Sequence, residues 1–427
     1  MNGLHGLTEN SAFYGMIICN VAIIISGLFA RSITRLLGTR VTLIISVILC
    51  GSINNVLFYP TNYLVYGAFL LNGLGWAVLR VAALAYMTKN STPRTLSRNN
   101  AIHWVMWTIG LILGNSVVML LNINTEEISD NKRFKIATAM TVICLLGIPG
   151  YFFTKYIPSD YEEQLILARG EEGEITELTP PRPAETVNLE SSLIIPNPHF
   201  RQESEQSDSR YESIMSEYPG EMRGVLDRVV DMCQVMLRRD TLLLLAPMFA
   251  AGVYATSYSP IIPTAVGAKC RPWIVSAFGI LVGCGQLVGA SITGGVVEKI
   301  TIRKLSIVTC GLSVLTFSLV ALVVQMGFSE RWKEWTHFSE VFILILAFLI
   351  GTCDMSNNVC LSIAIGRVYR ADADAAYSLF VTIMSLSMIS WYVLTTLTNS
   401  MLYVTLILYS VVSIVTAFSF SYIKFEE

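Results

Sequence analysis

Three polar side chains stand in the middle of a long apolar run in the C-terminal part of the sequence. Asp354, Asn357 and Asn358 lie within LAFLIGTCDMSNNVCLSIAIG, residues 346–366. Helical residues three or four positions apart share a face, so the three side chains form one polar cluster. Such a cluster suits the binding of a cation or a proton in a cavity between helices. The alternative is a neutral or paired acid that hydrogen-bonds to a neighbouring helix and strengthens packing.

The composition of the whole chain indicates where this cluster must lie. The chain has 427 residues, of which 53% are hydrophobic and 14% charged, and its mean hydropathy is +0.57. Soluble domains carry about 25% charged residues. We therefore expect an integral, multi-pass membrane protein. An ionised Asp354 that faced lipid would cost about 2.5–3.5 kcal/mol, so we expect this carboxylate to face protein or water.

Apolar stretches long enough to cross a bilayer, which takes about 20 helical residues, predict an all-α polytopic protein. We expect eleven transmembrane helices, five before a polar region and six after it, at residues 12–32, 41–59, 63–87, 101–121, 135–154, 241–263, 273–297, 305–327, 341–366, 375–398 and 402–423.

The connections between these stretches differ in their content of Lys and Arg. One side carries twelve such residues, and the other carries seven. The richer side is predicted to be cytosolic, because positive residues are retained on that side. The polar region and the C-terminus then lie in the cytosol, and the N-terminus lies outside.

Two basic connections resemble each other and suggest a repeat. GGVVEKITIRK, residues 294–304, resembles the loop signature of the major facilitator superfamily, and GLFARSITRLLGTR, residues 27–40, takes the matching place in the first half. Two helices precede this loop in the second half, but only one precedes it in the first. If both halves derive from a six-helix unit, the first helix is missing. We expect a lateral gap, which either a partner fills or a truncated gene model explains.

The sequence predicts four regions. Residues 1–155 form an N-terminal helical bundle, and residues 241–427 form a C-terminal one. Residues 156–223 are rich in Glu, Ser and Pro, and we expect a disordered acidic cytosolic loop. Residues 224–240 have a broad apolar face opposite charges, which predicts an amphipathic helix at the membrane interface. Within the loop, Tyr211 and Ile214 match a tyrosine-based sorting motif, a pattern that also arises by chance.

Two further polar residues lie inside predicted helices. Arg80 is a second intramembrane charge, and its long side chain can extend to the cytosolic interface. The sharper alternative is that Arg80 pairs with Asp354 across the two halves. His103 lies one turn inside the next span, where it is either a hydrogen-bonded interfacial histidine or part of a proton relay.

Small residues are expected to set the helix packing. Gly279 and Gly283, and likewise Gly285 and Gly289, have the spacing that lets helices approach closely. Most of the nine cysteines lie in apolar runs without the spacing of metal ligands, so we interpret them as core residues.

The block GLGWAVLRVAALAYMTKNSTPRTLSRNNAIHWVMWTIGLILGN, residues 73–115, resembles the most recognisable part of the uncoordinated-93-like family. The matching positions are Asn90, Ser91, Arg98, Asn99, Trp104, Gly114 and Asn115, with Asp354, Asn358 and Gly366 in the second half. Arg80, His103 and Trp107 depart from the family pattern. The resemblance implies a fold like that of the major facilitator superfamily, and members that act as potassium-channel regulatory subunits, trafficking partners or orphan carriers.

Two functions follow from these observations. The first is a regulatory or trafficking accessory of another membrane protein, such as an ion channel or a receptor, and the missing helix favours it. The second is a secondary transporter of a small solute or ion that uses the Asp354 cluster. We expect no enzyme activity and no cofactor or metal, because the sequence has no phosphate loop, metal cluster or nucleophile motif. The acidic balance of the polar region argues against nucleic-acid binding. The oligomeric state is not predicted.

Overall fold

The structure is a computed structural model that describes residues 11–92, 94–122, 130–152, 230, 234–262, 272–297, 299–328, 336–370, 372–397 and 401–423. The predicted sorting motif and the acidic loop lie outside these residues, and so does most of the predicted interfacial helix. The chain divides into two units, Met1–Ile157 with Gln234–Glu427, and Pro158–Cys233. All helices discussed below belong to the first unit.

The first half of the chain contributes five long helical segments. They are α1 (Ser11–Leu37), α2 (Thr39–Gly51), which continues through a short 3-10 turn, η1 (Ser52–Asn54), into α3 (Asn55–Phe58), α4 (Asn62–Lys89), α5 (Leu96–Asn122) and α6 (Asp130–Phe152). Gly38 separates α1 from α2 with a positive φ of 73°, a conformation in which glycine meets no steric penalty.

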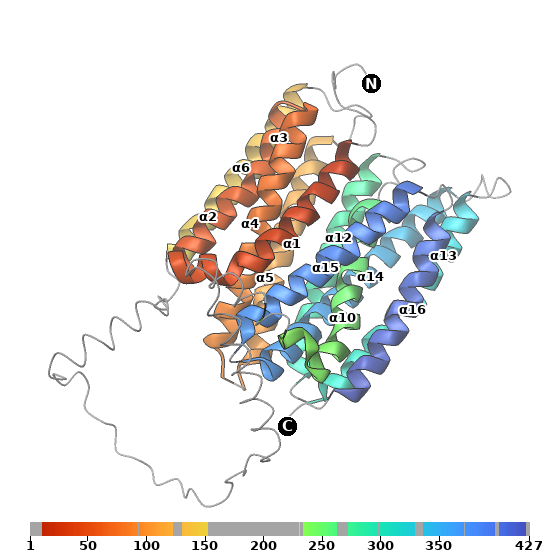
Figure 1. Ribbon diagram of the computed structural model, residues 1–427. Coiled ribbons are helices and arrows are strands. Elements are labelled where there is room, and N and C mark those ends of the chain that lie inside the picture. The colour runs from red at the N-terminus through yellow and green to blue at the C-terminus, as the bar shows by residue number, and fades with distance from the viewer. Residues whose placement is uncertain are drawn as a thin grey trace, which may run out of the picture. The chain divides into compact units, whose positions relative to one another are not determined.

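The second half of the chain contributes six long helical segments. They are α10 (Arg239–Thr256), which ends in a π-helical turn, η2 (Ser257–Ile261), then α12 (Pro272–Val296), α13 (Ile302–Phe328), α14 (Thr336–Val368), α15 (Ala373–Leu397) and α16 (Met401–Tyr422). The π turn contains Pro260, which has no backbone N–H to donate to the helix. The described residues contain no strand, so the predicted all-α architecture is confirmed (Figure 1).

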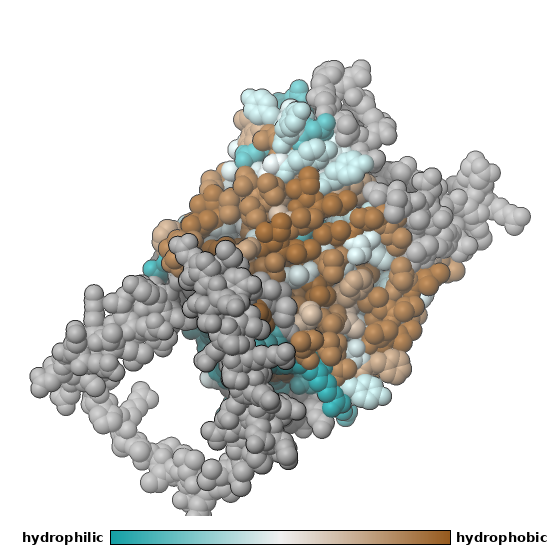
Figure 2. Space-filling model, viewed as in Figure 1, coloured by the Kyte–Doolittle hydropathy of each residue, from teal (hydrophilic) through white to brown (hydrophobic). Residues whose placement is uncertain are grey.

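Ten helical segments in the described residues are long and apolar enough to cross a membrane, and Ile407–Tyr422 in α16 is a shorter apolar stretch. Figure 2 shows a hydrophobic band across the middle of the visible face, with hydrophilic residues toward both ends of the helices. A bilayer places hydrocarbon against such a band and water against its borders, so the chain is an integral multi-pass membrane protein.

The packing of the two halves repeats. α1 packs on α4 as α12 packs on α14, and α2 packs on α6 as α13 packs on α16. The halves meet through α1 with α15 and through α5 with α12. In the second half α10 lies against α15 and α16. No described helix of the first half takes the corresponding place against α5 and α6. In each of these two helices only 11% of the most apolar membrane-spanning stretch is buried.

Glycines decide how closely α12 approaches its neighbours. A Cβ on Gly285 or Gly289 would overlap the backbone of Phe348 or Thr352 on α14, whereas one on Gly279 or Gly283 would strike side chains of α5. The two pairs that the sequence singles out therefore lie on different faces of one helix. Gly285 and Gly289 let α12 pack closely on α14 within the second half, and Gly279 and Gly283 let α12 pack closely on α5 of the first half. The seven cysteines within the described residues are free thiols. Four of them are buried, as expected of core residues, and three are partly exposed, namely Cys50, Cys144 and Cys284.

Candidate functional site

The polar cluster of α14 is buried at the boundary between the two halves. Asp354 is 2% exposed, and its carboxylate accepts hydrogen bonds from Asn358 Nδ2 at 3.0 Å and from Gln286 Nε2 of α12 at 2.9 Å. Tyr258 of η2 adds a hydroxyl beside Asp354 and Gln286. Four residues separate Asp354 from Asn358, so one helical turn is enough to bring their side chains together.

Arg80 reaches this cluster from the other half. It is 6% exposed, and its Nη2 donates to Asn358 Oδ1 at 3.3 Å, while its Nη1 lies 3.2 Å from the sulfur of Met384 on α15. The interpretation that this side chain extends to the cytosolic interface is therefore wrong. Arg80 has no direct ion pair with Asp354 among the interactions of the described residues. The amide of Asn358 connects the two charges instead.

Three aromatic rings surround the Arg80 guanidinium. Its Cζ lies 4.8 Å from the ring centroid of Trp76, 4.9 Å from that of Trp104 and 4.8 Å from that of Phe380. Aromatic faces attract cations most strongly where water is excluded. The rings come from α4, α5 and α15, so the guanidinium is held from both halves.

The network lines a cavity of about 280 Å³ between the halves. Side chains from α1, α4 and α5 face others from α10, α12, α14 and α15. Three buried polar atoms of lining residues lack a hydrogen-bond partner within the described part of the chain, namely Asn20 Oδ1 of α1, Gln286 Oε1 of α12 and Arg80 Nε of α4. Unpaired buried atoms of this kind are costly, which makes the cavity suited to a ligand that supplies hydrogen bonds.

The other two predicted residues lie apart from the network. Asn357 is 2% exposed, but its Nδ2 has no hydrogen-bond partner among the described residues, and it does not line the cavity. His103 packs its ring against Trp104, with 5.5 Å between centroids, and does not line the cavity either. The structure thus brings Asp354, Asn358 and Arg80 together and leaves Asn357 and His103 outside.

Three residues of the site were not predicted from the sequence, namely Gln286, Trp76 and Tyr258. For Gln286 a signal was present, because it is an amide in the middle of an apolar helix, as Asn357 and Asn358 are. For Trp76 and Tyr258 the sequence offers no such signal, because aromatic residues are common in apolar helices.

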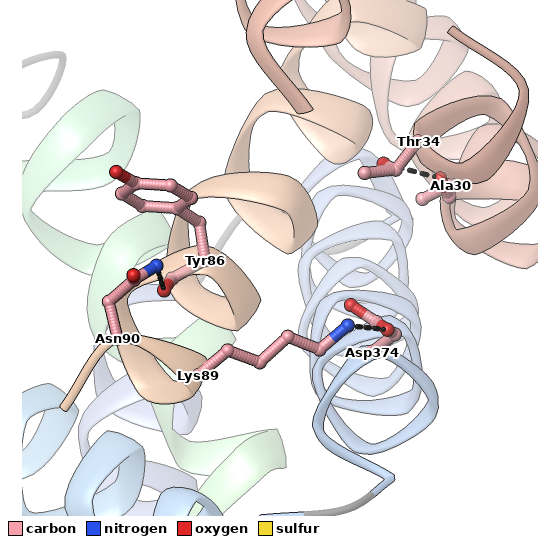
Figure 3. Close-up of polar contacts among 6 residues, drawn as sticks. All are labelled: Ala30, Thr34, Tyr86, Lys89, Asn90 and Asp374. Atoms are coloured by element: carbon pink, nitrogen blue, oxygen red, sulfur yellow. Dashed lines mark hydrogen bonds and ion pairs between the residues drawn. The ribbon is translucent and has the colours of Figure 1, made fainter. Parts of the chain in front are cut away.

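A second set of contacts joins the halves at the end that is predicted to be cytosolic. Lys89 at the end of α4 pairs with Asp374 at the start of α15, with 2.8 Å between Nζ and Oδ2 (Figure 3). Arg370 donates to the backbone oxygen of Ser91 at 2.6 Å, and the hydroxyls of Thr88 and Tyr377 are 3.0 Å apart. These contacts close the boundary between the halves, called the seam below, at this end.

The chain matches the family described as "Ion channel regulatory protein UNC-93" over residues 3–421. The chain belongs to the UNC-93 family. Two relatives are the proteins named UNC93-like protein MFSD11 from Xenopus laevis, 23% identical over 403 residues, and from Xenopus tropicalis, 21% identical over 392 residues. In both cases the alignment covers 89% of this chain and 81% of the relative.

Among solved structures, the fold resembles that of XylE, a proton:xylose symporter of the major facilitator superfamily. The structure with bound 6-bromo-6-deoxy-D-glucose has a TM-score of 0.67 and 13% identity, and the match covers 100% of this chain and 89% of XylE. A partially occluded inward-open conformation of XylE from E. coli has a TM-score of 0.63 and 13% identity, over 99% of this chain and 90% of XylE. At this identity the likeness shows the fold alone.

Several residues that carry the resemblance to the family lie where the halves meet. Trp104 of α5 donates to Ser362 of α14 at 3.3 Å, and Ser91 accepts from Arg370. A Cβ on Gly366 would press on Leu96 and Thr88 of the first half. The family pattern therefore coincides with the seam between the halves in this chain.

Proposed function

We propose that this member of the UNC-93 family is a secondary carrier that binds a small solute in the cavity between its halves. The observation that carries the proposal is the buried network of Arg80, Asn358, Asp354 and Gln286, which borders an internal cavity and takes its members from both halves. A network that served packing alone would not need a cavity beside it.

The charges of the network favour a solute without net charge, or a zwitterion. Arg80 and an ionised Asp354 offset each other within one site, so an added unpaired charge would meet a large desolvation penalty. The acceptors Asn20 Oδ1 and Gln286 Oε1 call for N–H or O–H donors on the solute. Tryptophan rings in the wall offer flat apolar surface beside them. A change in protonation of Asp354 is one way to couple solute binding to a proton.

Uptake by proteoliposomes tests the proposal. A panel of radiolabelled neutral and zwitterionic solutes is compared between the wild-type protein, Asp354→Asn and Ser318→Ala, whose hydroxyl is exposed on α13 and bonds within its own helix. We expect a solute that wild type and Ser318→Ala accumulate and Asp354→Asn does not. Uptake that Asp354→Asn leaves unchanged would remove this carboxylate from the mechanism. Cavity cysteines such as Asn20→Cys that react from only one side of the membrane under all conditions would rule out a carrier.

A second candidate function is that of a regulatory or trafficking accessory of another membrane protein, such as a potassium channel. The description of the family favours it. So do large apolar side chains on the two sparsely buried helices, because Met106 and Leu120 of α5 are 66% and 76% exposed and Leu146 of α6 is 72% exposed. A helix of a partner would cover such a face, although lipid also suits it.

Co-purification in mild detergent tests this candidate. If α5 and α6 bind a channel subunit, Leu120→Ala with Leu146→Ala should weaken its co-purification. Val308→Ala on α13, where the side chain is 66% exposed, should not. Equal recovery of the channel with both variants would contradict an interface on α5 and α6.

A further inference from the structure

A second cavity lies between α13 and α16, neither of which lines the cavity between the halves. Its volume is about 370 Å³, and its walls include Ile307, Gly311 and Val314 of α13 with Ile414 and Phe418 of α16. Ile307 is 43% exposed and Phe418 is 64% exposed. Because these exposed side chains belong to helices that cross the membrane, the cavity is a groove that faces the bilayer.

The groove presents hydrocarbon to its occupant. The two hydroxyls among its lining residues are already engaged, since Ser413 Oγ lies 2.9 Å from the Tyr254 hydroxyl and Ser421 Oγ donates to the Ala417 carbonyl at 2.8 Å. The remaining lining side chains are apolar, apart from the weakly polar thiol of Cys310. An occupant that needs hydrogen bonds inside the groove would lose those that it makes with water, so an alkyl chain fits best.

A basic cluster stands at one end of the groove. Lys304 precedes Ile307 by three residues, so it continues the lining face of α13 by one turn. It is exposed and has no ion pair or hydrogen bond within the described residues. Its neighbour Arg303 donates to the Ile423 carbonyl at 3.1 Å, which fixes the guanidinium next to the end of α16. α13 begins at Ile302, so the positive end of its helix dipole adds to both side chains.

We propose that this groove is a binding site for one anionic phospholipid, with an acyl chain between α13 and α16 and the phosphate at Lys304 and Arg303. The pattern of Lys and Arg places this end of the groove at the cytosolic leaflet, where anionic lipids are enriched. A neutral lipid fills the groove equally well but gains nothing from the basic end. Charge complementarity therefore selects the anionic headgroup. The proposal does not depend on whether the protein is a carrier.

Native mass spectrometry of the purified protein with added lipid tests the site. The probes are phosphatidylserine and phosphatidylcholine with the same acyl chains. We expect wild type to retain one phosphatidylserine in preference to phosphatidylcholine. Lys304→Gln should weaken the binding of phosphatidylserine about fivefold, which is the effect of one basic residue near a membrane surface. It should leave the binding of phosphatidylcholine unchanged. Lys135→Gln, which removes an exposed lysine on α6, is the matched control and should have no effect.

A second variant tests the groove itself. Gly311→Leu should fill it and abolish retention of the lipid, and it should not disturb folding because a Cβ at Gly311 meets no heavy atom within 4 Å. Gly67→Leu on α4, which has equally open space, is its control. Retention of phosphatidylserine by Gly311→Leu at the wild-type level would overturn the proposal. Equal binding of the two lipids by wild type would overturn it as well.

Discussion

Arg80 and Asp354 should stabilise the protein as a coupled pair, although no direct ion pair joins them. Each is buried, and the Asn358 amide connects them through hydrogen bonds of 3.3 Å and 3.0 Å. Arg80→Met leaves the carboxylate without a countercharge and Asn358 Oδ1 without its donor. Asp354→Asn leaves the guanidinium as an unpaired charge. Removing one partner of a buried pair costs about 3–5 kcal/mol, and we expect each single variant to lose about this much stability.

The double variant separates coupling from simple loss of contacts. The path through the Asn358 amide limits the distance between the charges to roughly 8 Å, which corresponds to a Coulomb energy of about 2 kcal/mol at an effective dielectric constant of about 20. Arg80→Met with Asp354→Asn restores neutrality. Its loss of stability should therefore fall short of the sum of the single losses by about 2 kcal/mol.

Unfolding by SDS in mixed micelles, followed by tryptophan fluorescence, measures these free energies. The control cycle uses Arg133→Met and Asp130→Asn, because this pair on α6 is in direct contact, with 3.1 Å between nitrogen and oxygen, but its Asp130 side chain is 80% exposed. An exposed pair contributes at most about 1 kcal/mol. Additive losses for Arg80→Met and Asp354→Asn would refute the reasoning, because they would mean that Asp354 is neutral in the folded protein or that its charge does not reach Arg80.

Three further predictions concern other parts of the chain. Gly351→Leu should markedly lower the melting temperature of the protein in detergent, because a Cβ at Gly351 overlaps the Val282 carbonyl of α12. Gly110→Leu is the control and should leave the melting temperature nearly unchanged, because the space around Gly110 is open. Equal melting temperatures for the two variants would show that α12 and α14 do not pack this closely. Lys89→Asp should raise the reactivity of a Thr88→Cys thiol with a water-soluble maleimide, because Lys89 and Asp374 pair across the seam. Adding Asp374→Lys should restore the pair and lower the reactivity again. The same reactivity in all three proteins would mean that this pair does not hold the seam closed. A tag at the N-terminus should bind antibody on intact cells, and a tag within residues 156–223 should bind only after permeabilisation; the reverse pattern would invert the predicted orientation.

The sequence by itself determined the membrane class, the approximate bounds of the helices and the family; of the eleven predicted membrane spans, ten are long and apolar enough within the described residues, and α16 shows only a shorter apolar stretch. Hydropathy and helical periodicity are properties of consecutive residues, so α4 and α14 are visible in the sequence within a few residues of their observed ends. The same periodicity places Asp354 and Asn358 on one face of α14, and the spacing of glycines along α12 predicts close packing. These features need no knowledge of neighbouring helices.

The tertiary structure decided what each polar side chain meets. Arg80 and Asn358 are 278 residues apart, and nothing in the surrounding sequence of either indicates the other. The sequence shows how far Arg80 lies from the end of α4, and at that distance its extended side chain could reach the interface. It does not show which helix faces that residue. Only the packing of α4 and α5 against α14 and α15 surrounds the guanidinium with aromatic rings and brings it to the Asn358 amide that connects it to Asp354.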